Sequence, residues 1–125
     1  MANLVVWVEI PVLDMDRAAN FYEKMMNAPT QPFNIPGAPK EVRVLSSDDH
    51  AITAGLVLGP GYEPSPDAGP LVYLNMGEDL QPALDRAEQA GARILRGKQM
   101  VGKDMGFDAV LIDSEGNRIA LHSAK

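Results

Sequence analysis

The sequence predicts an α+β fold in which paired βαβββ modules form a cupped, mostly antiparallel sheet around a cavity, with the helices outside. Three observations lead to this prediction. In each half of the chain the hydrophobic period indicates a strand, then a helix, then three strands. The two expected helix caps, Asp14 and Asp79, lie 65 residues apart. Residues 59–70, of which seven of twelve are Gly or Pro, divide the chain nearly in half.

The repeat predicts a single domain, residues 1–125, in which two units bury their apolar faces together. The first module covers residues 1–58, the Gly/Pro linker covers 59–70, and the second module covers 71–125. Neither half could easily build a core alone, because a short chain buries too little of its surface. The element order also allows one unrepeated α+β sandwich, and this alternative stays open.

The first module opens with a strand over residues 4–12 and continues as a helix over 15–26. Asp14 is the expected N-cap, because its carboxylate can accept the free amide hydrogens of the first helical turn. Three strands are predicted after the helix, and "SSDDH" is the turn between the last two. These strands cover residues 31–35, 40–46 and 52–59. Alternation places four aliphatic side chains on the face of the first strand that should meet the helices: Val6, Val8, Ile10 and Val12.

The second module repeats this order, with a strand over residues 71–76 and a helix over 80–90 capped by Asp79. Pro82 falls in the first turn of this helix, where a missing amide hydrogen does little harm. Three strands follow, and "DSEGN" is the hairpin turn between the last two. They cover residues 92–97, 107–113 and 118–123.

Composition excludes several classes of function. The chain has no cysteine, which rules out thiolate chemistry, Cys-ligated zinc and disulfides. Its net charge of −6 disfavours nucleic-acid binding, because an acidic surface repels phosphate backbones. The N-terminus does not resemble a signal peptide, and the longest apolar run is too short to span a bilayer. We expect a soluble cytoplasmic protein with no nucleic-acid or membrane partner.

Three stretches resemble a known family: "EIPVLDMDRAANFYEKM", "YLNMGEDLQPALDRAEQAGARIL" and "GFDAVLIDSEGNRIALHS". A βαβββ unit used twice is similar to the vicinal oxygen chelate superfamily. That superfamily includes glyoxalase I, extradiol dioxygenases, fosfomycin-resistance enzymes and bleomycin-resistance proteins. The last stretch resembles the family's closing hairpin, with Ser114 in place of the usual proline. The resemblance covers nearly the whole chain. It implies the fold more strongly than the function, because one fold hosts many chemistries.

The resemblance implies a divalent metal held by one His or Glu from each of four strands. We matched each of the superfamily's four ligand positions to a residue of this sequence. All four residues have side chains that cannot ligate a metal. They are Trp7, Leu56, Leu71 and Ala120. We therefore expect neither a metal nor another cofactor.

Alternation should place the remaining polar and aromatic side chains in the cavity, opposite the helix-packing face. The ligand-binding residues predicted in this way are Trp7, Glu9, Leu71, Tyr73, Asn75, Arg118 and His122, with Ala120 beside them. Glu9 and His122 are the candidate catalytic residues, with Glu9 as a general base or polar anchor and His122 as its partner. The alternative is a Glu9 that pairs with Arg118 or His122 and only fixes strand register. Trp7 either stacks against a planar ligand or occupies the space that a metal ion would take.

Three functions stay open. The first is a metal-independent binder of a small organic ligand, either cationic, because the surface is acidic, or planar. The second is a lyase, isomerase or dioxygenase of the same superfamily with a site remodelled around Glu9 and His122. The third is a structural or regulatory module whose cavity Trp7 closes. Because members of the superfamily commonly dimerise, the resemblance also implies a homodimer.

Overall fold

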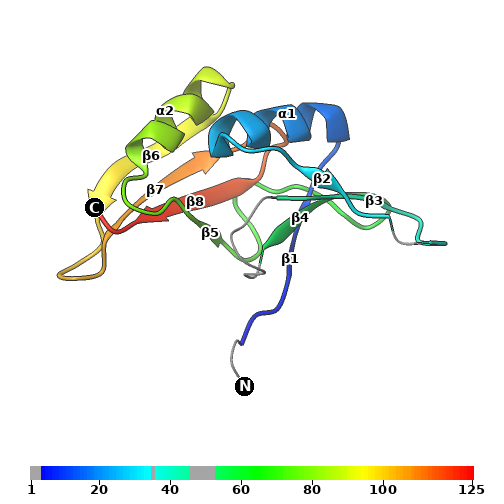
Figure 1. Ribbon diagram of the computed structural model, residues 1–125, viewed down its shortest axis with the longest axis horizontal. Coiled ribbons are helices and arrows are strands. Elements are labelled where there is room, and N and C mark those ends of the chain that lie inside the picture. The colour runs from blue at the N-terminus through cyan, green and yellow to red at the C-terminus, as the bar shows by residue number, and fades with distance from the viewer. Residues whose placement is uncertain (1–3, 35, 46–52) are drawn as a thin grey trace.

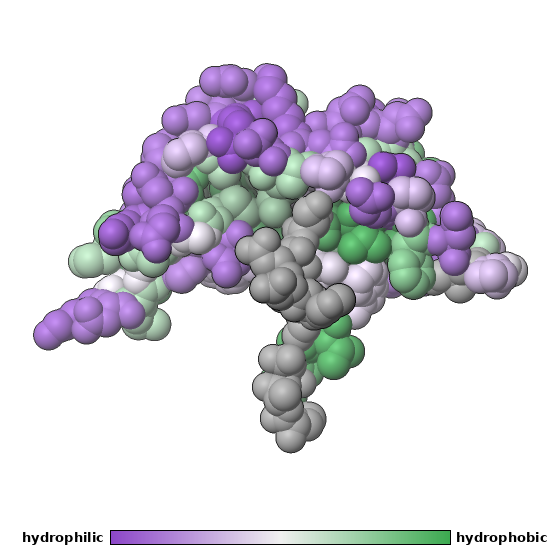
Figure 2. Space-filling model, viewed as in Figure 1, coloured by the Kyte–Doolittle hydropathy of each residue, from purple (hydrophilic) through white to green (hydrophobic). Residues whose placement is uncertain are grey.

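A computed structural model describes residues 4–34, 36–45 and 53–125 of the chain. Two helices, α1 (Met15–Met26) and α2 (Gln81–Gln89), lie side by side along one edge of the view, with the strands below them (Figure 1). The outer surface of this helical edge is mostly hydrophilic, and hydrophobic residues come into view lower down, nearer the strands (Figure 2). This is the α+β arrangement with outside helices that the sequence predicts.

The first module forms a four-stranded sheet. Its strand order is β1-β4-β3-β2, where β1 is parallel to β4 and the other neighbours are antiparallel. Glu9 of β1 lies opposite Gly55 of β4. The predicted turn "SSDDH", with His50, lies outside the described residues. The strands are β1 (Val8–Pro11), β2 (Gln31–Pro32), β3 (Glu41–Val44) and β4 (Ala54–Leu58).

The second module forms a sheet with the same topology, in the order β5-β8-β7-β6. Again the first and last strands of the module are parallel, with Asn75 of β5 opposite His122 of β8. The two sheets therefore confirm the repeated βαβββ unit. The strands are β5 (Val72–Asn75), β6 (Arg93–Met100), β7 (Phe107–Ile112) and β8 (Arg118–Ser123).

One hydrophobic cluster joins the two modules. It contains Tyr22 and Met25 of α1 together with Leu111 of β7 and Leu121 of β8. Ile10 and Val12 belong to this cluster and Val8 packs against it, which confirms the predicted inner face of β1. The prediction was wrong at Val6, which is 77% exposed. The strand begins only at Val8, where pairing with the first residue of β4 starts.

The two helix caps differ. Asp14 is the N-cap of α1, and its carboxylate accepts a hydrogen bond from the Arg17 amide at 3.0 Å, as predicted. The prediction for Asp79 was wrong by one position, because Leu80 is the N-cap of α2. The Asp79 carboxylate accepts from the Gln81 amide and pairs with Lys98 instead. None of the described helices is long and apolar enough to span a membrane.

Candidate functional site

Four side chains from three separate segments meet on the outer face of β1. The Glu9 carboxylate accepts hydrogen bonds from Tyr62 Oη at 2.8 Å, from Lys40 Nζ at 3.3 Å and from Trp7 Nε1 at 3.3 Å. Lys40 also donates to Tyr62 Oη at 3.1 Å. We call Trp7, Glu9, Lys40 and Tyr62 the Glu9 cluster. Lys40 precedes β3 and Tyr62 lies in the Gly/Pro linker, so the fold brings both to β1 from a distance in sequence.

The charges within the Glu9 cluster offset each other. Burial raises the pKa of the Glu9 carboxyl, but the hydrogen bonds from Tyr62, Trp7 and Lys40 outweigh this and hold the pKa below its ordinary value. Hydrogen bonds to Tyr62 and Glu9 raise the pKa of the Lys40 ammonium. Both groups are therefore charged at neutral pH, as a salt bridge of 3.3 Å. A carboxylate with a lowered pKa is a poor general base at that pH.

The indole of Trp7 contacts the sheet at a glycine. A Cβ placed on Gly55 would lie 2.6 Å from Trp7 Cζ2, so only glycine leaves room for the indole here. Trp7 is 39% exposed, so part of the residue faces solvent. Phe33, itself 51% exposed, lies beside it with ring centroids 6.5 Å apart. Trp7 therefore presents a partly exposed aromatic side chain next to a fixed group of polar atoms.

The other predicted ligand-binding residues lie on the second sheet. Tyr73 is 55% exposed on β5. Asn75 accepts a hydrogen bond from the Gly77 amide, and the Arg118 amide donates to Ser65 O in the linker. Leu71 is half-buried directly before β5. These residues therefore flank the parallel pair of β5 and β8 rather than the Glu9 cluster.

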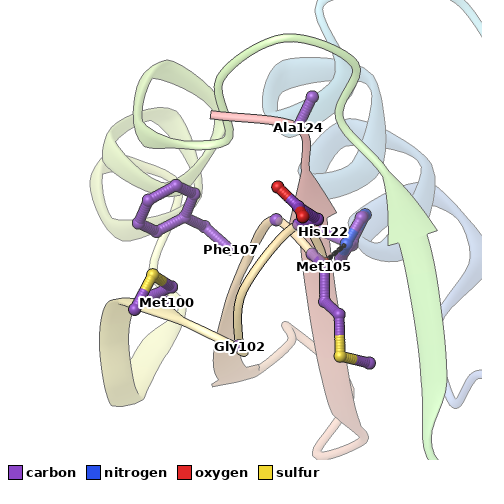
Figure 3. Close-up of a pocket in the computed structure, with 8 residues that line it drawn as sticks. Met100, Gly102, Met105, Phe107, His122 and Ala124 are labelled. Carbon is purple, nitrogen blue, oxygen red and sulfur yellow. Dashed lines mark hydrogen bonds between the residues drawn. The ribbon is translucent and has the colours of Figure 1, made fainter.

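His122 lines a pocket of about 510 Å³ at the end of the β6–β7 hairpin. Its Nε2 lies 2.9 Å from Met105 O, within hydrogen-bond distance. In Figure 3, Met105 and His122 lie on one side of the pocket, and Met100 and Phe107 lie on the other. The lining also includes Gly102, Asp104, Gly106 and Ala124.

Glu9 and His122 are not partners. Among the described residues no hydrogen bond or ion pair joins them, because Glu9 contacts Lys40 and Tyr62 while His122 contacts Met105. The alternative pairing of Glu9 with Arg118 was also wrong, since Lys40 provides the opposite charge. Sequence alternation identifies residues that share a strand face, but it does not report partners contributed by loops. Lys40 and Tyr62 are such loop residues, and nothing in their local sequence pattern singles them out.

The four positions that the resemblance assigns to metal ligands carry no metal-binding side chain. Trp7 lies on Gly55, Leu71 is aliphatic, and Ala120 is fully buried. Leu56 belongs to the hydrophobic core between the modules. The Cβ direction of its neighbour Gly55 points toward Trp7, and Gly55 cannot ligate through a side chain either. Within the described ranges, no three His, Cys, Asp or Glu residues gather in a way that could hold a metal ion. These residues do not fit the metal centre that the resemblance implies.

The repeated βαβββ topology and the match to a family model identify the class of protein. Residues 4–121 match the model of the Glyoxalase/Bleomycin resistance protein/Dioxygenase superfamily. The chain therefore belongs to this superfamily. No curated protein matches the chain.

Solved structures share the fold at low sequence identity. A V278E mutant of glyoxalase I from Zea mays aligns with a TM-score of 0.68 and 18% identity over 94% of this chain. The chain spans only 45% of that maize protein. Trypanothione-dependent glyoxalase I from Leishmania major aligns with a TM-score of 0.70 and 16% identity, over 98% of this chain and 87% of that one. The fosfomycin resistance protein FosX from Listeria monocytogenes aligns with a TM-score of 0.67 and 10% identity, over 100% and 94%. At such identities the likeness concerns the fold alone.

Proposed function

We propose that this protein binds a small organic molecule without a metal ion, and that Trp7 and the Glu9 cluster hold it. One observation carries the proposal: the position expected to supply the first metal ligand holds an indole that lies on Gly55 and remains partly exposed. An aromatic surface with a few fixed polar groups beside it is the usual composition of a site for a planar ligand. A cytoplasmic homodimer is the setting that we propose for this activity.

The second candidate is an enzyme of the superfamily with a remodelled site. The pocket of about 510 Å³ beside His122 favours it, because an imidazole in a partly apolar pocket suits proton transfer. The separate hydrogen bonds of Glu9 and His122 count against a catalytic pair. We therefore prefer ligand binding at Trp7 as the proposed function and keep a reaction at His122 as the second candidate.

A thermal-shift screen with planar organic molecules tests the proposed function. A ligand of Trp7 should raise the melting temperature in a saturable way, because it binds only the folded chain. The stabilisation should fall in Glu9→Gln, since this variant loses the carboxylate that holds the indole nitrogen and the Lys40 ammonium in place. Glu88→Gln is the matched control, because Glu88 is exposed on α2. Stabilisation that survives Glu9→Gln but disappears in His122→Ala would move the ligand to the His122 pocket.

A further inference from the structure

We infer that the ligand held beside Trp7 is a neutral planar molecule whose edge carries a hydrogen-bond donor next to an acceptor, as a carboxamide or a lactam does. Glu9 accepts from the donor of this ligand, and Lys40 donates to its acceptor. The inference rests on the proposed function above and names the chemical class of its ligand. Three features of the Glu9 cluster support it: the net charge of its ion pair, the hydrogen-bonding sites that remain on the pair, and the distance between those sites.

The ion pair of Glu9 and Lys40 carries no net charge. The carboxylate and the ammonium lie 3.3 Å apart, and the hydrogen bonds around them keep both groups ionised at neutral pH. Lys40 attracts an anionic ligand while Glu9 repels it, and the reverse holds for a cation. A charged ligand therefore gains little net attraction to set against the cost of removing its charge from water. A neutral polar ligand avoids most of that cost.

One hydrogen-bonding site remains on each partner of the ion pair. An ammonium has three donors, and within the described part of the chain Lys40 uses one toward Glu9 Oε2 and one toward Tyr62 Oη. A carboxylate has about four acceptor sites. Glu9 Oε2 accepts from Trp7 and Lys40, whereas Oε1 accepts from only one described residue, Tyr62. The remaining acceptor site is therefore on Oε1 and the remaining donor is on Nζ, so a group that both donates and accepts satisfies the two together.

The two remaining sites are close enough for one functional group to reach both. Tyr62 Oη lies 2.8 Å from Glu9 Oε1 and 3.1 Å from Lys40 Nζ, so these two atoms are no more than about 5.9 Å apart. A carboxamide carries its N–H and C=O groups side by side, and each can span a hydrogen bond of about 2.9 Å. Trp7 Nε1 donates to the same carboxylate at 3.3 Å. A ring in contact with the indole can therefore present such an edge to the ion pair.

Both partners of the ion pair are accessible from solvent. The side chain of Glu9 is 30% exposed and that of Lys40 is 23% exposed. Glu9 is thus the more exposed partner, and it is also the one that bonds the indole nitrogen. Hydrogen bonds to ionised groups are roughly twice as strong as those between neutral groups. The donor of the ligand, which meets Glu9, is therefore as important for binding as the acceptor.

Quenching of the Trp7 fluorescence tests the inference, because the chain has one tryptophan. The four probes share a nitrophenyl ring: 4-nitrobenzamide, which donates and accepts; methyl 4-nitrobenzoate, which only accepts; the anion 4-nitrobenzoate; and the cation 4-nitrobenzylammonium. N-acetyltryptophanamide is the reference for collisional quenching. We expect saturable quenching by 4-nitrobenzamide, with a Kd about tenfold below that of each other probe.

Removing one partner of the ion pair should turn the preference toward the probe that replaces the lost charge. Lys40→Met leaves the Glu9 carboxylate without its cation, so 4-nitrobenzylammonium should become the tightest probe. Glu9→Gln leaves the Lys40 ammonium without its anion, so 4-nitrobenzoate should become the tightest probe. The matched controls are Lys24→Met on α1 and Glu88→Gln on α2, which make the same changes of charge at exposed positions. Both controls should keep 4-nitrobenzamide as the tightest probe.

The outcomes separate this inference from the proposed function. Wild-type binding of the ester, the anion or the cation that is as tight as binding of the amide overturns the neutral donor–acceptor ligand and leaves binding at Trp7 standing. A preference for the amide that survives both Lys40→Met and Glu9→Gln also overturns it, because the ion pair is then not what binds the edge. Quenching by all four probes that never exceeds the collisional reference overturns this inference together with the aromatic site at Trp7.

Discussion

The contact between Trp7 and Gly55 decides what the outer face of β1 can do. The indole occupies the place that the resemblance reserves for a metal ligand, and it can lie there only because the residue opposite Glu9 on the neighbouring strand has no Cβ. Glu9 then fixes the indole nitrogen by a hydrogen bond. At the scale of single residues, the aromatic surface depends on a glycine as much as on the tryptophan.

Gly55→Ala should displace the indole. The new Cβ would lie 2.6 Å from Trp7 Cζ2, and we expect a loss of about 1–3 kcal/mol in the free energy of unfolding together with a shift in Trp7 emission. Urea denaturation followed by fluorescence measures both. The matched control is Gly97→Ala in β6, where nothing lies within 4 Å of the added Cβ, so stability should stay level or rise by up to about 1 kcal/mol. An unchanged emission maximum in Gly55→Ala would refute the close contact.

Gly106→Ala should disrupt the His122 pocket. Gly106 has a φ of +76°, and an added Cβ would collide with Ser123 O and lie 2.9 Å from His122 Nε2. Gly69→Ala is the control, because Gly69 has a similar φ of +84° but nothing within 4 Å. Both variants lose about 1–2 kcal/mol to the left-handed backbone conformation. Gly106→Ala should lose about 1–3 kcal/mol more by overpacking, as urea denaturation would show. An equal loss in the free energy of unfolding in the two variants would mean that the loop around Gly106 moves aside without strain.

At the scale of elements, the β7–β8 turn of the second module holds the start of α1 in the first. Glu115 accepts hydrogen bonds from the Leu13 and Asp14 amides at 2.7 and 2.8 Å and pairs with Arg17 at 2.6 Å. Asn117 donates to Pro11 O at 2.7 Å. The turn that the sequence identifies as a hairpin is thus also a cap for a helix about a hundred residues away.

Glu115→Gln should weaken this link between the modules. Burial raises the pKa of the Glu115 carboxyl, but the hydrogen bonds from Arg17, Leu13 and Asp14 lower it to about 2, against an ordinary 4.5. A carboxyl with a lowered folded-state pKa stabilises the fold above pH 4.5, and this contribution is lost as the pH falls toward 2. We expect a loss of about 2 kcal/mol at pH 7, after allowing for solvent around the half-exposed Arg17.

Urea denaturation between pH 7 and pH 2 measures this contribution. The wild-type chain should lose stability below pH 4.5 more steeply than Glu115→Gln, and the two curves should converge at the acid end. Glu88→Gln, at an exposed position on α2, should run parallel to the wild type. Parallel curves for Glu115→Gln and the wild type would show that Glu115 is not held as described.

The helices and strands of this chain are largely predictable from its sequence. Each of them buries one face, so its apolar residues recur at a fixed period. The helix at residues 15–26 and the repeated order of elements along the chain follow from periodicity, and the cap at Asp14 follows from its carboxylate. The displaced cap at Asp79 does not, because Lys98 of β6 competes for that carboxylate. The extra strand length predicted before Val8 reflects β-propensity without a partner strand.

For the molecule as a whole, we propose that the hydrophobic cluster shared by the two modules makes them one folding unit. Residues 71–125 alone would expose the side chains that this module contributes to the cluster, among them Leu111 and Leu121. We expect this fragment to show no cooperative thermal transition by circular dichroism, whereas the full chain should show one. A cooperative transition in the isolated fragment would contradict the shared core.

The composition of the site is less predictable than the fold, and the reason is topological. Alternation places Trp7 and Glu9 on the outer face of β1, yet Lys40 and Tyr62 reach them from segments without a regular period. The expected single pocket around Glu9 and His122 is instead a cluster on the first sheet and a pocket on the second. Loop residues do not alternate between apolar and polar types as strand residues do. Their position relative to the strands therefore becomes clear only from the three-dimensional structure.

The central claim is that this member of the superfamily works without a metal. The most direct measurement is the metal content per chain, determined by native mass spectrometry after purification without chelators and after dialysis against Mn²⁺, Ni²⁺ and Zn²⁺. The proposed function predicts well under one metal ion per chain in every case, because Trp7, Leu71 and Ala120 offer no ligand. One tightly bound ion per chain that is lost in Glu9→Gln or His122→Ala would contradict it.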